Sequence, residues 1–497
     1  MDHCASVLLA FPTEEASTAD NEKYNKAVKA HISNINSLFK ERSAVIGDNA
    51  YKLLDLLNPA INSLSYLYLL AALLPQGTKN AEYDKEFAER VILFFRRFDP
   101  RQIRYMGVAF SDLFSATGRR NVMPPTIAVP ILADALLRLD PSGSVLTSNH
   151  IFLMKLAYNS NFIGPALRVA AKRIVHYPGM INPPDPKSLI LCDLRLPPSS
   201  YISQDTGFTT RLTALQVLEY DWLVGLLYCA ARDWPAAQAA FARTASHPSR
   251  DSGVSKVMLE AFKKWVLVSL LAEGRITTPG GFAPYISQAS ARTFGIMARP
   301  YAAVAKRFES ADADALRLAV EVSSQQFAED GNEGLVAEVL ESHQKWQIVR
   351  LREVYSKVSL AEINAKTKSA VTGAPVGSEE DMTQLIETMI DSGMLRAAIE
   401  PPRATGGDGA TTPACLAFLA EEADITEQEV AQRIAQSVER IKQLGAVYNA
   451  TKERLATSRE YIRHAVKDQK REKDNREGGF ETQIEDEDLM SGIVSGQ

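Results

Sequence analysis

The sequence predicts a mainly α-helical protein in which a TPR-like helical-repeat solenoid leads into a small winged-helix subdomain and a long C-terminal helix. Three observations predict this fold class. Apolar residues recur at helical spacing through most of the chain, and Pro and Gly separate the apolar clusters. Strand signals are confined to residues 394–419, and an apolar stripe follows the last predicted helix. We therefore expect helix pairs that bury their apolar faces by stacking on one another.

The composition fits this class and excludes some functions. The 497 residues are 46% hydrophobic and 23% charged, and the formal net charge is -5. No whole-chain positive field is therefore available to attract nucleic acid or anionic lipid. The four scattered cysteines form no C-x-x-C pair, which is typical of reduced thiols. The start of the chain lacks the positive region of a secretory signal, so we expect the protein to stay inside the cell.

The first part of the chain is predicted as helical repeats. After an N-terminal extension over residues 1–20, residues 21–209 contain a ladder of short helices. The apolar run over residues 61–74 is too short to span a membrane, so we interpret it as a buried core helix. A Pro-rich loop over residues 177–208 interrupts the ladder and allows only a short element around Leu189 to Leu194.

One helix pair carries the order of the tetratricopeptide pattern. Gly225 and Tyr228 are followed by Ala237, Phe241 and Pro248 at nearly the expected spacing. The small residues Gly225 and Ala237 would let the two helices approach closely, and the two aromatic rings would fill the space between them.

The helical repeats continue over residues 210–357. The segment from Val257 to Leu271 is apolar nearly all round, so we expect this helix inside the stack. Within it, we expect Trp265 in the core and Lys263 and Lys264 on the solvated rim.

The pattern changes at Val358, where a winged-helix subdomain is predicted over residues 358–420. A capping box at Ser359 opens a short helix, and a second helix runs from Ser378 to Ser392. Two short apolar segments, 394–399 and 414–419, then predict a β-hairpin around a Gly-rich tip. Two helices followed by a hairpin is the order of a winged helix.

The hairpin supplies the first candidate interface. A small sheet has an edge with unpaired N–H and C=O groups, which a neighbouring chain can extend by adding a strand. The alternative is an edge that its own loop protects. The candidate residues on this edge are Met394, Leu395, Ala397 and Ile399.

The long helix predicted over residues 426–476 supplies the second candidate interface. Its apolar stripe needs a partner, because the burial of its apolar side chains must offset the entropy lost in ordering some fifty residues. That partner is either the solenoid of the same chain or a bundle of helices from other subunits. The candidate residues are Ile434, Val438, Ile441, Leu444, Tyr448 and Leu455. The acidic tail over residues 477–497 is predicted to be disordered.

Motifs for catalysis are missing from the sequence. It contains no nucleotide-binding Gly-rich loop, no HExxH and no nucleophile elbow, and its seven histidines never fall within four residues of one another. We therefore expect no enzyme, with no catalytic, cofactor-binding or metal-binding residues and no cofactor. The second helix of the predicted winged helix carries five acidic residues and no Lys or Arg, so DNA readout is disfavoured.

Helical repeats that close on a winged helix, followed by a long C-terminal helix, are the layout of PCI-domain proteins. Within that family, the run from Val257 to Leu270 is similar to the corresponding helix of the third-subunit family of the COP-nine signalosome. Residues 327–336, 348–360 and 390–394 resemble the same family. The resemblance is continuous from about Leu215 to Ile399, and it departs in the Pro-rich loop and in the Gly-rich wing tip.

The resemblance implies a non-catalytic scaffold subunit of the signalosome, the complex that removes Nedd8 from cullins and so regulates cullin-RING ubiquitin ligases. The zinc site for that reaction would lie in a different, metalloprotease-type subunit. The implied partners are the other signalosome subunits, both PCI and metalloprotease-type, and indirectly the neddylated cullin-RING ligases. No nucleic acid and no membrane are implied, and the implied localisation is cytoplasmic and nuclear.

Two other functions stay open on the sequence alone. A PCI scaffold subunit of the proteasome lid shares the architecture, and it would purify with lid subunits. A winged-helix nucleic-acid-binding protein would bind DNA or RNA with a strong dependence on salt.

Overall fold

The computed structural model describes residues 1–13, 20–74, 85–119, 122–178, 189–248, 253–277, 286–310, 312–404, 411–419 and 427–457, with residues 459, 461–463 and 466–467. The chain divides into two units, Met1–Leu419 and Ala420–Gln497. The predicted acidic tail lies outside the described residues, as do residues 179–188 of the Pro-rich loop and residues 405–410 of the wing tip.

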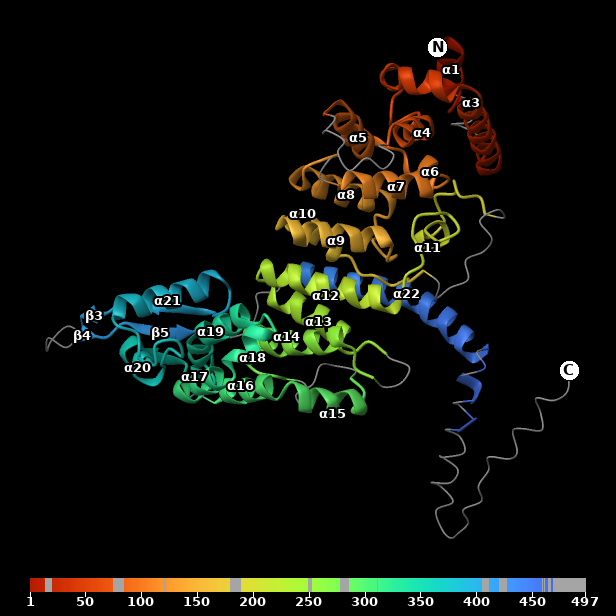
Figure 1. Cartoon of the computed structure of the whole chain (residues 1–497). Helices are drawn as coiled ribbons and strands as arrows, with labels where there is room; N and C mark the ends of the chain where they lie inside the picture. Colours follow the sequence, from red (N-terminus) through yellow and green to blue (C-terminus); the bar gives the residue numbers. More distant parts are fainter. Residues whose placement is uncertain are drawn as a thin grey trace, which may run out of the picture. The chain divides into compact units, whose positions relative to one another are not determined.

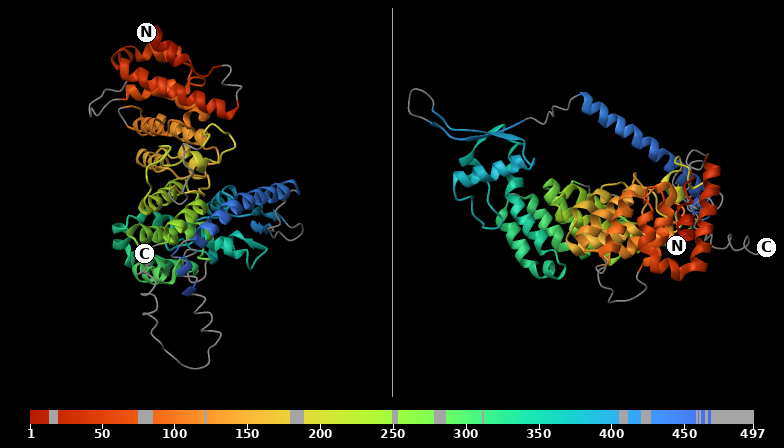
Figure 2. Two further views of the ribbon diagram at one scale, coloured as in Figure 1. Left: turned by 90° about the vertical axis from the view of Figure 1, so that its right-hand side faces the viewer. Right: turned by 90° about the horizontal axis from the view of Figure 1, so that it is seen from above.

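The first unit is built mainly from helices. Up to the Pro-rich segment they are α1 (Asp2–Leu9), α3 (Asn21–Leu56), α4 (Ser63–Leu73), α5 (Lys85–Arg97), α6 (Pro100–Ile103), α7 (Gly107–Thr117), α8 (Pro125–Leu139), α9 (Ser148–Ser160) and α10 (Gly164–Ala170). After it come α11 (Pro198–Tyr201), α12 (Ala214–Ala230), α13 (Trp234–Ala245), α14 (Lys256–Glu273), α15 (Gln288–Met297), α16 (Arg299–Glu309), α17 (Ala313–Val322), α18 (Ser324–Glu329) and α19 (Glu333–Leu351). Successive helices pack side by side in chain order (Figures 1 and 2), which confirms the predicted helical-repeat solenoid.

The N-terminal extension begins with a helix that belongs to the core. Cys4 and Leu8 of α1 are buried, and α1 packs against α3. His31 of α3 connects this region to α4, because its Nε2 lies 3.0 Å from Oγ of Ser65, and that hydroxyl donates to the carbonyl oxygen of Leu8 at 2.7 Å. Burial lowers the pKa of His31 to about 4, so the ring is neutral at pH 7.

Aromatic rings fill the core of the first helices. Phe94, Phe95 and Phe98 at the end of α5 and in the turn after it meet Phe110 and Phe114 of α7, with ring centroids 5.5 to 6.3 Å apart. All five rings are buried. Each aromatic ring buries a large apolar area, so this cluster stabilises the packing of α5 against α7.

The segment that follows the Pro-rich loop differs from the prediction. The short element expected around Leu189 to Leu194 is a series of turns, and the regular element, α11, comes later. Nη1 of Arg104 donates to the carbonyl oxygens of Leu191, at 3.1 Å, and Asp193, at 2.7 Å. Because a buried side chain takes up these carbonyl groups, the backbone here needs no helical ladder. Leu191 is itself buried, so this part of the predicted Pro-rich loop belongs to the core.

The tetratricopeptide-like pair forms as its small residues predict. α12 and α13 pack against each other, and a Cβ added to Gly225 would stand only 2.6 Å from the ring of Phe241. Ala237 and Phe241 are fully buried between the helices. The carboxylate of Asp233 caps α13 by accepting from the N–H of Ala236 at 3.1 Å. The close approach predicted at Gly225 is therefore confirmed.

The two lysines of α14 lie in the interior, so the prediction that they occupy a solvated rim is wrong. Lys263 is 4% exposed and Lys264 is 7% exposed, while Trp265 is buried as expected. Nζ of Lys263 donates to Oε1 of Glu260 at 2.9 Å and to Oδ1 of Asp330 at 2.6 Å. Burial alone lowers the pKa of Lys263, but its hydrogen bonds to these carboxylates outweigh burial and hold the pKa above its usual value.

A chain of hydrogen bonds continues from these lysines to the corner between α18 and α19. Nζ of Lys264 donates to Oδ1 of Asn332, and Nδ2 of Asn332 donates to Oη of Tyr301 at 2.7 Å. The Tyr301 hydroxyl in turn donates to Oδ2 of Asp330 at 2.7 Å. Burial lowers the pKa of Lys264. Besides Glu260 on α14 itself, the acceptors that make burial of both lysines possible thus lie on a turn that is remote in sequence.

The winged-helix subdomain follows α19. Its elements are β1 (Lys357–Ser359), α20 (Leu360–Lys366), α21 (Glu379–Asp391), β2 (Ala397–Glu400), β3 (Arg403–Ala404), β4 (Thr411–Thr412) and β5 (Cys415–Phe418). The expected two helices and hairpin are confirmed, and β3 and β4 extend the hairpin toward its tip. The sequence did not predict β1, which pairs with β5 and makes a three-stranded antiparallel sheet in the order β1-β5-β2.

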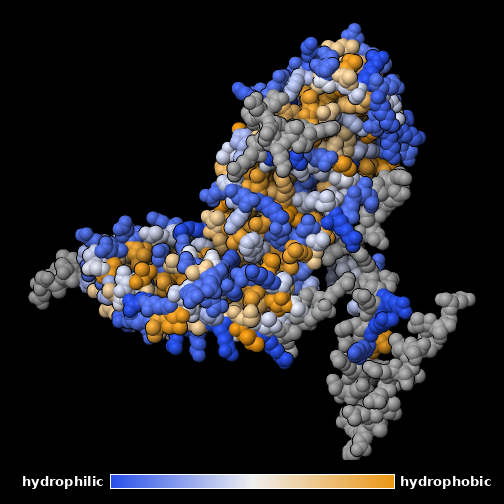
Figure 3. Space-filling model, in the orientation of Figure 1, coloured by the Kyte–Doolittle hydropathy of each residue, from blue (hydrophilic) through white to orange (hydrophobic). Residues whose placement is uncertain are grey.

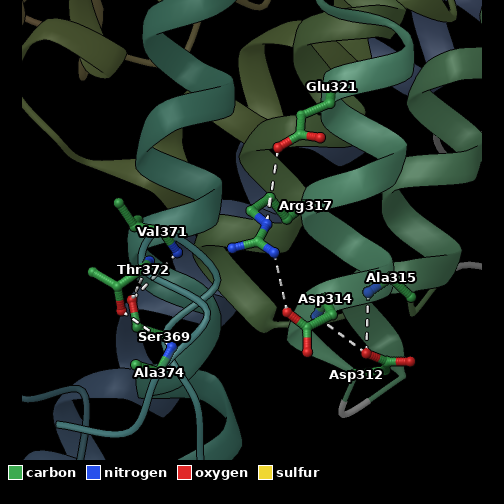
Figure 4. A network of polar contacts seen from close by, with 9 residues as sticks. All are labelled: Asp312, Asp314, Ala315, Arg317, Glu321, Ser369, Val371, Thr372 and Ala374. Carbon is green, nitrogen blue, oxygen red and sulfur yellow. Dashed lines mark hydrogen bonds and ion pairs between the residues drawn. The ribbon is translucent and has the colours of Figure 1, made fainter.

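A loop of the winged-helix subdomain packs against α17. In Figure 4 the turn that carries Ser369, Val371 and Thr372 faces the Arg317 guanidinium group, which lies between Asp314 and Glu321. A Cβ added to the glycine of this turn, Gly373, would stand 2.5 Å from Nη1 of Arg317. Gly373 has a φ of +73°, so glycine suits this turn both for its backbone and for its lack of a side chain. This contact between Gly373 and Arg317 packs the winged-helix subdomain against the helical repeats.

The described part of the second unit contains the long helix α22 (Glu427–Thr457). It covers the first part of the long helix predicted over residues 426–476. Residues 468–476 lie outside the described residues.

Candidate subunit interfaces

The free edge of β2 is defined by its pairing with β5. The N–H of Leu419 donates to the carbonyl oxygen of Arg396 at 3.0 Å, which places Arg396 in an inward, hydrogen-bonded position. In an antiparallel ladder this orientation recurs at every second residue. Ala397 and Ile399 occupy the alternate positions, so their backbone N–H and C=O groups point away from β5. No strand among the described residues pairs with this side of β2.

Two of the predicted edge residues lie before the strand. The strand expected from Met394 begins at Ala397, because the preceding residues close the end of α21. The N–H of Leu395 donates to the carbonyl oxygen of Met389 at 3.1 Å, and the Leu395 side chain is only 2% exposed. Leu395 therefore presents no free edge donor. Ala397 and Ile399 are the two predicted residues that do lie on the edge.

The sheet has a second edge, β1, which the sequence did not predict. Phe418 donates from its N–H to the carbonyl oxygen of Ser356 at 3.0 Å, so Lys357 and Ser359 direct their backbone groups outward by the same alternation. Nζ of Lys357 lies 2.7 Å from Oε2 of Glu400 on β2. This ion pair links the two edge strands across β5. The only local signal for β1 in the sequence is the apolar Val358 between two polar residues.

The exposed side of α21 is acidic. Glu379, Glu380 and Asp381 occupy its first turn, and Glu387 and Asp391 follow, all of them exposed. Oγ of Ser378 caps the helix by accepting from the N–H of Asp381 at 3.1 Å. Acidic side chains in the first turn also interact favourably with the helix dipole, so this helix is locally well determined. Its surface charge is opposite to that of a helix that binds phosphate groups.

The apolar stripe of α22 is exposed where the structure describes it. Ile434, Ile441 and Tyr448 recur every seven residues and are 58%, 69% and 66% exposed, and Val438 lies between them with 45% exposure. Leu444 is half-buried, and nothing is described of the side chain of the next member of the series, Leu455. A seven-residue repeat of large apolar residues is the pattern of a helix that packs along another helix.

Apolar residues also reach the surface of the first unit. Figure 3 shows them as separate patches among hydrophilic side chains, in contrast to a continuous apolar band. Within the described ranges, no helix combines the length and apolar character needed to cross a membrane. No cluster of three or more His, Cys, Asp or Glu side chains suited to holding a metal ion occurs in the part of the chain that the structure describes.

Comparisons with known proteins agree on one family. The family model for the N-terminal helical repeats of COP9 signalosome complex subunit 3 matches residues 22–192 and 198–287. COP9 signalosome complex subunit 3 of Neurospora crassa is 39% identical, over 99% of this chain and 99% of the relative. The protein of the same name from Emericella nidulans is 29% identical over 88% of this chain and 89% of its own, and that from Drosophila melanogaster is 24% identical over 72% and 74%.

The family match covers the first part of the helical architecture. The matched model spans the repeats from α3 to the residue before α15, and the relative from Neurospora crassa is aligned over 99% of the chain, which includes the winged-helix subdomain and α22. The chain therefore belongs to the COP9 signalosome complex subunit 3 family.

Proposed function

We propose that this chain is a non-catalytic scaffold subunit of the signalosome, the complex that removes Nedd8 from cullins and so regulates cullin-RING ubiquitin ligases. It assembles through its winged-helix sheet edge and through a bundle formed by its C-terminal helix and those of other subunits. The relatives named as subunit 3 of that complex support the assignment to the complex.

The observation that carries the proposal is the exposed stripe of α22. Most helical stability in proteins comes from packing of an apolar face, and α22 is a helix of 31 residues whose apolar stripe is exposed. Burying each large apolar side chain of the stripe supplies about 1.5 to 3 kcal/mol. Residues such as Ile441 and Tyr448 therefore gain substantially when other helices cover them.

The proposal also specifies what the chain does not do. The reaction belongs to a metalloprotease-type subunit, and this chain supplies no cofactor or metal. It contacts neddylated cullin-RING ligases only indirectly, binds neither nucleic acid nor membrane, and works in the cytoplasm and the nucleus. The acidic exposed face of α21 supports the absence of nucleic-acid binding.

The direct test is purification of the chain from its own cells. The tagged endogenous protein is isolated gently, its partners are identified by mass spectrometry, and the eluate is assayed for release of Nedd8 from a cullin. We expect signalosome subunits and activity. Recovery of proteasome-lid subunits, or of nucleic acid alone, would contradict the proposal.

A variant pair separates assembly from folding. Ile434→Asp combined with Ile441→Asp places two charges in the stripe, and we expect the chain to leave the complex while its circular dichroism stays unchanged. Gln432→Asp combined with Gln436→Asp adds the same charge on the opposite face of α22 and is expected to leave assembly intact. Co-elution of the Ile434/Ile441 variant with the complex would refute the role of the stripe.

A further inference from the structure

A groove lies where the helical repeats meet the winged-helix subdomain. Its volume is about 590 Å³, and its walls come from the start of α13, the end of α14, the middle of α19 and the turn between α21 and β2. This volume is in the range of pockets that enclose several side chains. Neither the sheet edge nor the stripe of α22 includes it.

The inner wall of the groove is apolar and aromatic. Trp234, Leu271, Trp346 and Met394 line it. A Cβ added to Gly274, which has a φ of +70°, would stand 2.4 Å from the ring of Trp346, so the indole rests directly on that backbone. Trp and Met are enriched where proteins bind one another, because they offer large contact areas. The groove is therefore suited to an apolar or aromatic anchor.

The rim of the groove carries charges of both signs. Nη2 of Arg232 lies 2.5 Å from Oε1 of Glu338, so these two neutralise each other. Glu341 and Lys345, one turn apart on α19, also line the groove, and neither side chain has an ion-pair or hydrogen-bond partner among the described residues. One free carboxylate and one free ammonium group fit a segment that brings one basic and one acidic side chain. A polyanion is disfavoured by the carboxylates.

The groove lies close to the free edge of β2 along the chain. Met394 lines the groove, and β2 begins three residues later at Ala397, so at most about 10 Å of chain separates them. A segment of another subunit that pairs with Ala397 and Ile399 therefore needs only a few further residues to reach the groove.

We propose that the groove is the specificity pocket of the β2 interface. It receives the segment of the neighbouring subunit that flanks the strand paired with β2, and this segment carries a large apolar or aromatic anchor with a basic and an acidic residue beside it. The inference rests on the proposed function, because it takes the neighbour at β2 to be a signalosome subunit. Backbone pairing at the edge accepts many sequences, whereas the pocket selects one.

A variant that fills the groove tests this pocket. Ser342 lines the groove on α19, and Ser342→Trp places a bulky ring inside it. Ala337 is exposed on the same helix and does not line the groove, so Ala337→Trp is the matched control. We expect Ser342→Trp to lower recovery of one signalosome subunit with the tagged full-length chain at least tenfold, and Ala337→Trp to leave recovery within twofold. Equal recovery with both variants overturns the proposal.

Cross-linking gives a readout that does not depend on tolerance of the tryptophan. Benzoylphenylalanine is incorporated at Ser342 of the full-length chain in its own cells, and the cross-linked peptide is identified by mass spectrometry. A peptide from a signalosome subunit with the stated anchor and flanking charges supports the proposal. A cross-link within this chain, a peptide without an apolar anchor, or no cross-link in an intact complex overturns it.

A third variant distinguishes this inference from the function on which it rests. Ala397→Pro removes an outward N–H from β2 without touching the ladder to β5, and it should release the same subunit as Ser342→Trp. Release of different subunits by the two variants would overturn the proposal that the groove and the β2 edge bind the same neighbour. If the unmodified chain purifies without any signalosome subunit, the proposed function fails and the inference fails with it. If the unmodified chain purifies with the complex and Ser342→Trp does not change the recovery of any subunit, the inference alone fails.

Discussion

Lys263 illustrates how a buried charge depends on partners that are distant in sequence. Its ammonium group is neutralised by Asp330 on a turn 67 residues away and by Glu260 one turn earlier on α14. The sequence shows only two lysines beside a tryptophan, and surface exposure is the usual state of lysine. No local sequence pattern indicates that Asp330 and Asn332, at the corner between α18 and α19, accept hydrogen bonds from the two lysines. The prediction that the lysines occupy a solvated rim was therefore wrong.

Removing this ammonium group should be costly. Lys263→Met leaves the largely buried Asp330 carboxylate without its cationic partner, and we expect the free energy of unfolding to fall by about 3 kcal/mol. The control is Lys85→Met, which breaks an exposed 3.9 Å pair with Glu89 and should change stability by less than about 0.5 kcal/mol. Chemical denaturation measures both, and equal effects would show that the buried network adds no stability.

His150 makes stability depend on pH. Burial lowers its pKa to about 4, against 6.5 in an unfolded chain, although Asp140 opposes this shift. Between these values the unfolded chain binds a proton that the folded chain does not, so the stability is complete above pH 6.5 and is lost as the pH falls. The loss from this one residue at pH 5 is about 2 kcal/mol.

The variant His150→Gln removes this titration and keeps the helix cap. The N–H of Thr147 donates to Nδ1 of His150 at 3.3 Å, and a glutamine oxygen can accept at the same position. We expect the difference in denaturation free energy between pH 7 and pH 5 to shrink in the variant. An unchanged difference would mean that other groups account for the acid sensitivity, among them His31, which both proteins retain.

At the scale of elements, helix packing was the most predictable feature. The small residues Gly225 and Ala237 indicated a close helix pair because the tetratricopeptide spacing places them opposite large rings, and α12 and α13 pack in that way. The hairpin was predicted because its two strands are close in sequence. β1 was missed because it has three residues and its partner β5 begins at Cys415, so neither length nor a turn marked it.

Two glycine substitutions should have opposite effects. In Gly225→Ala the new methyl group meets the buried ring of Phe241, and we expect a loss of about 1 to 3 kcal/mol despite the better helix propensity of alanine. Gly334 lies in α19 with no atom within 4 Å of an added Cβ, so Gly334→Ala should raise stability by up to about 1 kcal/mol. Thermal melting of both variants measures this contrast, and a stabilising Gly225→Ala would refute the close packing.

At the scale of the whole molecule, the predicted order of repeats, winged helix and long helix follows from periodicity and capping signals, which are local. The side-chain contacts that fix irregular segments to the helices were not predictable. Nη1 of Arg104 donates to the carbonyl oxygen of Leu191, 87 residues later, and no spacing rule predicts such a contact. The same holds for the candidate site, because the sequence indicated the hairpin edge but not the residue at which the strand begins.

The first unit should fold without the second. The buried apolar clusters of the described residues all lie within residues 1–419. We expect a chain cut after Leu419 to keep the melting temperature of the full chain within about 2 °C and to lose its place in the complex. A large drop in melting temperature would show that α22 stabilises the first unit.

The order of the sheet, β1-β5-β2, also sets when the subunit can be assembled. Its central strand is the last of the three to leave the ribosome, so β1 and β2 have no partner until Phe418 has been synthesised. Unpaired strand edges in a nascent chain are prone to misassociation. The edge at which we propose that a neighbour binds is therefore complete only after β5 has been synthesised, so pairing at this edge has to follow that step.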